Sequence, residues 1–318
     1  MLKKLFTVLL LVAAGGCEER KSAQLEYPKA SLTTPIHETP WGDNGISLQT
    51  PHYTIYMTVQ GQRMNMVLPG FMEASYGLYE QLTNSAQNPK YTMPMYMLAS
   101  RQEWARMTQK LFGHVGPDNF IENGGYTFRG VTVCWDIGGM NTLSVAAHEG
   151  LHQYLWYFYK NRLPLWAEEG LATQCEGFVL TDNSVRFLPQ ENIMRIDSMR
   201  EALKAGDWLP IEQLLVTTSR KQLGQGELYG LGYYGQLYVL VRFLRGHEVY
   251  GPRWAKMLDD AKTGKFQTIF GEQVMTLPPA AYYQAVAVKA FTHYISSDLQ
   301  VFEQEFKDYA KNMTIKKP

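Results

Sequence analysis

The chain has 318 residues, and its 30 acidic and 30 basic side chains cancel to a formal net charge of zero. Without an excess of positive charge, the sequence has no field that would attract nucleic acid or anionic lipid, so we expect no nucleic-acid partner. Residues 48–318 are long enough to bury a large core, either as one catalytic domain or as two closely packed lobes.

The first seventeen residues, MLKKLFTVLLLVAAGGC, predict an export signal. Lys3 and Lys4 precede an apolar run from Leu5 to Ala14, which is too short to be a permanent transmembrane helix. The small residues directly before Cys17 resemble the lipobox of bacterial lipoproteins, in which the cysteine is acylated and becomes the mature amino terminus. We therefore expect a protein of the bacterial cell envelope that is held to a membrane by lipid on Cys17. The alternative is an ordinary signal with a fortuitous cysteine.

Residues 18–47 are polar, rich in Pro, Ser and Thr, and lack a sustained apolar period, so they predict a flexible tether. An α/β region follows. Its expected elements are paired strands at 52–59 and 61–68, a helix at 71–84, a strand at 91–99, a helix at 100–112 and one or two strands within 124–137. The last of these is either an ordinary core strand or a sheet edge on which a peptide could pair.

The stretch 142–172 contains the motif H-E-x-x-H as His148, Glu149 and His152. It lies in a segment with helical apolar spacing that ends near Lys160. On a helix, positions i and i+4 lie on one face, so the two imidazoles can bind the same metal ion. Glu149 can then reach a metal-bound water without being a ligand. A chance match is the alternative, and a third ligand is needed to decide.

A second helix, LWAEEGLATQCEGF, follows a short turn and supplies the candidate third ligand, Glu169. Two histidines and one glutamate leave the fourth position of a tetrahedral zinc ion for water. Glu176 lies seven residues further on, on the same helix face, and could accept the free N–H of a histidine ligand. A solvated helix face is the alternative for each carboxylate; we disfavour it for Glu169, leave it open for Glu176 and favour it for Glu168.

The segments HEGLH and LPLWAEEGLATQCE together resemble the gluzincin metallopeptidases, and are most similar to the peptidase-MA-like domains of bacterial proteins. The resemblance covers at least residues 125–245. It implies that zinc is bound by His148, His152 and Glu169 and that Glu149 is the general base.

The chain departs from the aminopeptidase N group of this family in three respects. Its connector between the second and third ligands, sixteen residues long, is slightly shorter, and Glu168 stands where the family usually has asparagine. The family's G-x-M-E-N strand is matched only faintly by Gly138–Asn141, which lacks the acid, so aminopeptidase specificity is not expected.

Beyond Glu176 the sequence looks helical throughout. The expected helical segments are 189–206, 209–217, 229–246, 251–264 and the closing run 279–313. The segment YGLGYYGQLYVLVRFL resembles the tyrosine-containing helix of peptidase-MA-like domains, and the resemblance implies that one of its tyrosines stabilises an oxyanion. Tyr234 is the first choice, and Tyr229, Tyr233 and Tyr238 are the other candidates. A core aromatic with a satisfied hydroxyl is an equally good interpretation of Tyr234.

Two cysteines remain after the proposed lipidation site. Cys134 precedes the metal helix and Cys175 lies on the helix of Glu169, so a disulfide and two separate buried thiols are both open. Neither is expected to bind metal.

The predicted fold class is α+β, a gluzincin-like zinc metallopeptidase with an N-terminal α/β lobe containing a mixed sheet and a mainly helical C-terminal lobe. The predicted function is hydrolysis of peptide or protein substrates outside the cytoplasm, with Zn²⁺ as cofactor. The alternative is a binding or scaffolding lipoprotein that keeps the fold but has no catalytic activity.

Overall fold

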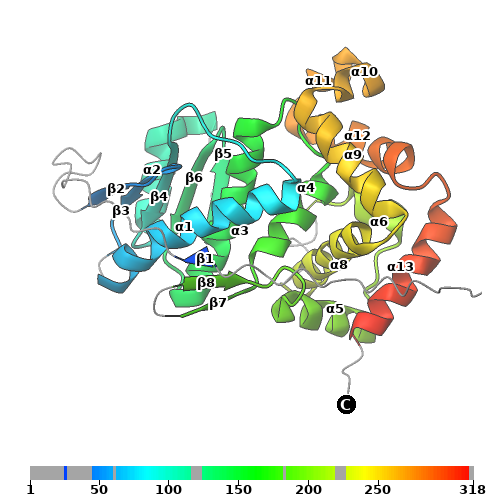
Figure 1. Ribbon diagram of the computed structural model, residues 1–318, viewed down its shortest axis with the longest axis horizontal. Helices are drawn as coiled ribbons and strands as arrows, with labels where there is room; N and C mark the ends of the chain where they lie inside the picture. Colours follow the sequence, from blue (N-terminus) through cyan, green and yellow to red (C-terminus); the bar gives the residue numbers. More distant parts are fainter. Residues whose placement is uncertain are drawn as a thin grey trace, which may run out of the picture.

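The computed structural model describes residues 25–26, 45–59, 62–115, 124–181, 184–218 and 227–314. These residues form an α+β structure with a mixed five-stranded sheet in the N-terminal part and a mainly helical C-terminal part (Figure 1). The predicted signal peptide, with Cys17, lies outside the described residues.

The five-stranded sheet has the strand order β2-β3-β4-β6-β5. The strands are β2 (Ile46–Gln49), β3 (Tyr53–Met57), β4 (Met93–Leu98), β5 (Gly125–Phe128) and β6 (Val131–Trp135). The three central strands are parallel, whereas β2 and β5 pair antiparallel at the two edges. A mixed sheet is therefore confirmed, and β5 is an edge strand.

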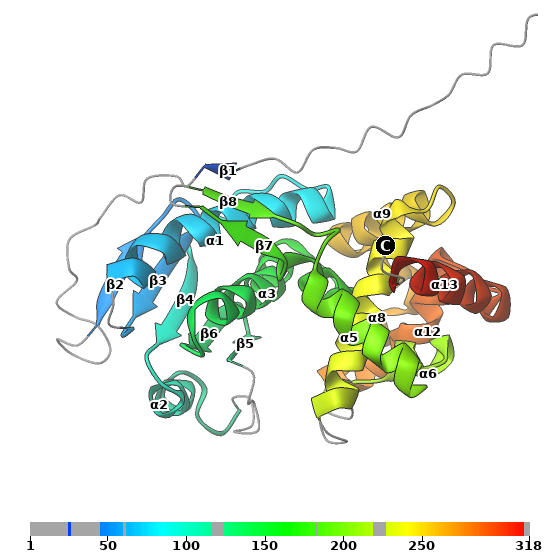
Figure 2. The same cartoon turned by 90° about the horizontal axis from the view of Figure 1, so that it is seen from below.

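Helices cover both faces of this sheet. α1 (Gln62–Thr83) and α3 (Gly139–Phe158) lie side by side on one face, and α2 (Arg101–Phe112) packs on the other (Figures 1 and 2). Side chains of a strand alternate between the two faces. In β4, Met95 and Met97 belong to the core under α1 and α3, while Tyr96 and Leu98 join Trp104 of α2. Both faces of the sheet are thus buried, and α3 has a firm support.

The predicted strand at 61–68 is wrong, because these residues form the first turns of α1. An alternating pattern would bury Met64, Met66 and Leu68 together. Instead Met66 is 72% exposed, and Leu68 is buried with Phe71, three residues further on. The apolar residues follow the helical period, which the short alternating run of methionines obscured.

The prediction of helix throughout the region beyond Glu176 is also wrong at its start. β7 (Phe178–Leu180) and β8 (Ser184–Phe187) form a three-stranded antiparallel sheet with β1 (Leu25–Glu26), in the order β1-β8-β7. β1 lies inside the segment 18–47 that was expected to be a tether. Strands this short have no measurable period, and they are held by pairing and by the packing of Phe178 and Phe187 against Phe71.

In the helical part, α8 contacts α4, α5, α9 and α13. The helices of this part are α4 (Leu165–Ala172), α5 (Ile193–Ala205), α6 (Ile211–Val216), α8 (Glu227–Gly246), α9 (Tyr250–Thr263), α10 (Phe266–Phe270), α11 (Glu272–Met275), α12 (Pro279–Tyr294) and α13 (Leu299–Thr314). None of the helices in the described ranges combines the length and the apolar character that crossing a bilayer requires.

Candidate metal centre

α3 presents its H-E-x-x-H motif on the one face of the helix that is not covered. His148, Glu149 and His152 are partly exposed, whereas the residues between them are buried. On the opposite side α1 approaches so closely that a Cβ on Gly150 would lie 2.4 Å from the Tyr79 hydroxyl. The back of the helix is therefore fixed by α1, and its two histidines lie on the opposite, partly exposed side.

The next helix, α4, brings Glu169 to the same place. Glu169 is only 8% exposed. The residue after it, Gly170, allows contact with α8, since a Cβ there would lie 2.4 Å from Val241 Cγ2 and 3.0 Å from the Leu237 carbonyl oxygen. The glycine that follows the third candidate ligand thus fixes the helix that carries it.

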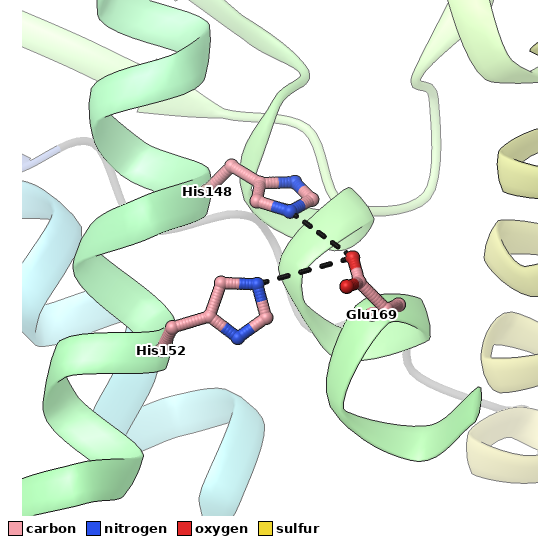
Figure 3. A group of neighbouring side chains, drawn as sticks. All are labelled: His148, His152 and Glu169. Carbon is pink, nitrogen blue, oxygen red and sulfur yellow. Dashed lines mark ion pairs between the residues drawn. The ribbon is translucent and has the colours of Figure 1, made fainter. Parts of the chain in front are cut away.

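The three candidate ligands point toward one another from two neighbouring helices (Figure 3). Glu169 Oε2 lies 3.3 Å from His148 Nε2 and 3.9 Å from His152 Nε2. One donor atom from each residue lies within 4.8 Å of the others. Tetrahedral bonds of about 2.0–2.1 Å place neighbouring donors about 3.3 Å apart. The spacing suits a metal ion, and Glu169 Oε2 is buried without any hydrogen bond in the structure, as a ligand atom would be.

A second carboxylate orients each histidine from its other nitrogen. His148 Nδ1 lies 2.8 Å from Glu176 Oε1, and His152 Nδ1 lies 3.0 Å from Glu168 Oε1. With a proton on each Nδ1, both Nε2 atoms are free to face Glu169. Of the two interpretations left open for Glu176, the structure therefore favours the contact with a histidine over a solvated face. For Glu168 the expected solvated face is wrong, because its side chain is 16% exposed and bonded to His152.

Glu176 reaches His148 by a different backbone path from the one expected. The α-helix that carries Glu169 ends at Ala172, and a 3₁₀ turn, Thr173–Cys175, precedes Glu176. Glu176 therefore caps this turn and does not lie on a continuous helix face. The Glu176 carboxylate nevertheless lies beside His148.

Three polar residues that sequence reasoning missed support these carboxylates. Arg195 of α5 donates to both oxygens of Glu176, at 2.5 and 2.8 Å, and the side-chain amide of Asn192 donates at 3.4 Å. On the other side, the hydroxyl of Tyr283 in α12 donates to Glu168 Oε2 at 3.3 Å. These partners lie 16 to 115 residues from the carboxylates in the sequence, so local spacing does not predict them.

The site is strongly negative, and this charge favours a cation. Burial alone would raise the pKa of Glu176, but the charge of Arg195 and the hydrogen bonds from His148 and Arg195 together outweigh burial and lower that pKa to about 2. Burial opposes protonation of His148, yet the neighbouring carboxylates of Glu169 and Glu176 raise its pKa to about 10. The same carboxylates that stabilise an imidazolium would stabilise a metal ion in its place.

Glu149 lies on the open face of α3 beside the ligands but is not one of the three grouped donors. Its backbone oxygen accepts a hydrogen bond of 2.7 Å from the hydroxyl of Thr127 in β5. The edge strand of the sheet is thereby joined to α3 at the level of the predicted general base.

α8 brings one tyrosine to the ligands. The ring of Tyr234 is centred 6.2 Å from that of His148 and is partly exposed. The hydroxyls of Tyr233 and Tyr238 each donate to a backbone carbonyl, at 3.1 Å, which assigns them to packing. The side chain of Tyr229 lies outside the described residues. Among the candidate tyrosines whose side chains the structure describes, Tyr234 alone adjoins a metal-ligand candidate.

Cys134 and Cys175 are separate buried thiols and do not form a disulfide. Of the two interpretations left open by the sequence, the structure therefore has the separate thiols. Burial raises the pKa of both thiols well above the ordinary value, which keeps them protonated and unsuited to bind metal.

The fold and the site define an α+β protein in which two partly exposed histidines and one buried glutamate form a group that is suited to a metal ion. No model of a protein family matches the chain, and no curated protein matches it either. The functional argument therefore depends on the chemistry of the side chains.

Proposed function

We propose that the protein is a zinc-dependent metallopeptidase of the gluzincin type. The observation that supports this most strongly is the buried Glu169 Oε2, which has no hydrogen bond and lies 3.3 Å from the Nε2 atom of His148. Carboxylates on both Nδ1 atoms add to the support, because they fix the histidines in the orientation that a metal needs.

The donor set of two imidazole nitrogens and one carboxylate oxygen matches catalytic zinc, which keeps a fourth position open. A zinc ion held there would supply Lewis-acid activation of water and of the substrate carbonyl. Glu149 then takes the proton of the attacking water and returns it to the leaving amine. Tyr234, whose ring is centred 6.2 Å from that of His148, would donate a hydrogen bond to the oxyanion that develops on the carbonyl.

The edge strand β5 offers the backbone groups that an extended peptide needs. Because Thr127 joins this strand to the Glu149 backbone, a peptide paired along β5 has its scissile carbonyl beside the base. Pairing through the backbone gives affinity with little dependence on sequence. The proposed substrates are peptides or unfolded protein segments in the cell envelope, where the export signal and lipidated Cys17 expected from the sequence would place the enzyme.

The test is digestion of a peptide library by the purified, zinc-loaded protein, read by mass spectrometry. We expect cleavage that a chelator abolishes and that Glu149→Gln lowers by about 10² to 10⁴-fold with zinc still bound, since an amide cannot accept the proton. Glu169→Ala should lose most of its zinc. A protein that binds zinc but cleaves nothing in the library would refute the proposal and favour a binding or scaffolding lipoprotein.

A further inference from the structure

The open face of α3 continues one turn beyond the metal ligands. Positions 148, 152 and 156 follow one another at helical spacing, and the three residues between His152 and Trp156 are buried. Trp156 is 47% exposed. Its indole, with the neighbouring Tyr157 ring, extends the partly exposed side of α3 that begins at His148.

Arg162 lies over this indole, with its guanidinium carbon 5.6 Å from the ring centroid. It comes from the loop between α3 and α4, and the backbone of that loop is held firmly. The Tyr282 hydroxyl donates to the Arg162 carbonyl, and Asn161 N donates to the Ala261 carbonyl at 3.0 Å. The arginine therefore projects from a fixed position.

The guanidinium of Arg162 has no ion pair within the part of the chain that the structure describes. Glu168, on the next helix, is already engaged by His152 and by Tyr283. A positive charge that stacks on an aromatic ring and has no carboxylate of its own is suited to bind an anionic group from a ligand.

The length of α3 between Glu149 and Trp156 matches a short piece of extended peptide. Thr127 of β5 is bonded to Glu149, and the next turn brings Gly130 against Trp156, where a Cβ would lie 2.5 Å from the indole. Seven helical residues from 149 to 156 span about 10 Å, and three residues of an extended chain span about the same length. A peptide along β5 thus passes from the base to the indole within two or three residues.

We propose that Arg162, stacked on Trp156, is a specificity subsite for a carboxylate two or three residues from the scissile bond. The inference rests on the proposed peptidase function. The carboxylate is either an Asp or Glu side chain or the free C-terminus of the substrate, because a guanidinium binds both in the same forked geometry.

The test compares peptides that share a cleavage site and differ in one group two or three residues away: Glu against Gln, and a free against an amidated C-terminus. The Glu and Gln residues are placed two and three residues from the scissile bond, first on its N-terminal side and then on its C-terminal side. Arg162→Gln should raise the KM for the carboxylate peptides about tenfold and leave their kcat unchanged, because the contact is lost equally from the bound substrate and the transition state. The neutral peptides should be unaffected.

Arg101→Gln is the matched control, since Arg101 is an exposed arginine over Trp104 on the far side of the sheet and its loss changes the net charge equally. An equal change in KM for charged and neutral peptides, or the same effect in Arg101→Gln, would overturn the subsite. Arg162→Lys, which keeps the charge but not the fork, should recover part of the preference, and a melting curve shows that each variant is folded.

Binding to the Glu149→Gln protein separates the two proposals, because it needs no turnover. Fluorescence anisotropy of labelled peptides should show tighter binding of the carboxylate member of each pair, and Arg162→Gln should abolish that difference. A protein that keeps the preference but cleaves no peptide refutes the peptidase and leaves the subsite intact. A protein that binds both members equally refutes the subsite, whether or not it cleaves.

Discussion

The sharpest prediction concerns Glu176, which accepts a hydrogen bond from Nδ1 of His148 on the side of the ring away from Glu169. In Glu176→Gln the amide oxygen still accepts the Nδ1 hydrogen, at a site where the present distance is 2.8 Å, but the negative charge is gone. Loss of a partner that orients a metal ligand typically weakens metal binding by about 10- to 100-fold. We expect the upper half of that range, because the Glu176 side chain is 4% exposed and little water can replace the charge.

Glu168→Gln provides a matched comparison at the second histidine. Its carboxylate is 16% exposed and has no arginine, so we expect a loss of zinc affinity of only about tenfold. Both affinities are measured by competition with a chromophoric chelator at a fixed pH. Equal losses, or no loss in Glu176→Gln, would refute the argument that the buried, arginine-held carboxylate controls the site.

Glu176→Gln also leaves Arg195 as a buried charge without its ion-pair partner, which typically costs about 3–5 kcal/mol of stability. The double variant Glu176→Gln with Arg195→Gln removes both charges and should recover part of the melting temperature of the metal-free protein. Its zinc affinity should stay low. Recovery of affinity together with stability would mean that the single variant had simply distorted the fold.

Three further predictions test separate parts of the structure. Gly170→Ala should destabilise the protein by about 1–3 kcal/mol in a thermal melt, because its Cβ would overlap Val241; an unchanged melt would mean that the contact is loose. Burial opposes the charge of His52, but Glu73 outweighs this and raises the His52 pKa above 6.5, while that contact lowers the Glu73 pKa below 4.5 despite burial. The pair therefore stabilises the fold fully between about pH 4.5 and 6.5 and less on either side. His52→Gln should remove up to about 1 kcal/mol of this pH-dependent stability, as unfolding curves across that range would show. Tyr234→Phe should lower kcat by about 10² to 10³ with little change in KM, whereas a lower melting temperature at unchanged kcat would assign the phenol to packing.

The three candidate metal ligands could be predicted to lie together because their geometry is local. His148 and His152 are four residues apart on one helix, and Glu169 follows on the next helix after a short turn. Glu168 could not be placed in the same way, since adjacent helical residues point about 100° apart and only one was expected to face the site. Glu168 and Glu169 both contribute to the site because the two histidines lie one helical turn apart: Glu169 lies between their Nε2 atoms, and Glu168 binds the Nδ1 atom of His152.

The residues that hold Glu176 and Glu168 in place could not be predicted from the sequence, for a different reason. Arg195 and Tyr283 approach the site from α5 and α12, and their positions depend on how these helices pack around the core. The same limit explains β7 and β8, which are three and four residues long and exist through pairing. Interactions between distant segments leave no periodic signal, whereas helices with long apolar faces do.

The two small residues inside the motifs show why the ligand pattern includes glycine. Gly150 lies between the two candidate histidine ligands and Gly170 follows the candidate glutamate ligand, yet both glycines are buried against other elements. Gly150 lies against the Tyr79 hydroxyl of α1, and Gly170 lies against Val241 of α8. A side chain at either position would overlap with these atoms. Helices held this closely from behind cannot rotate freely, so the donors of His148, His152 and Glu169 are positioned by packing before any ion binds. The part of each motif that contains no ligand therefore determines how precisely the ligands converge.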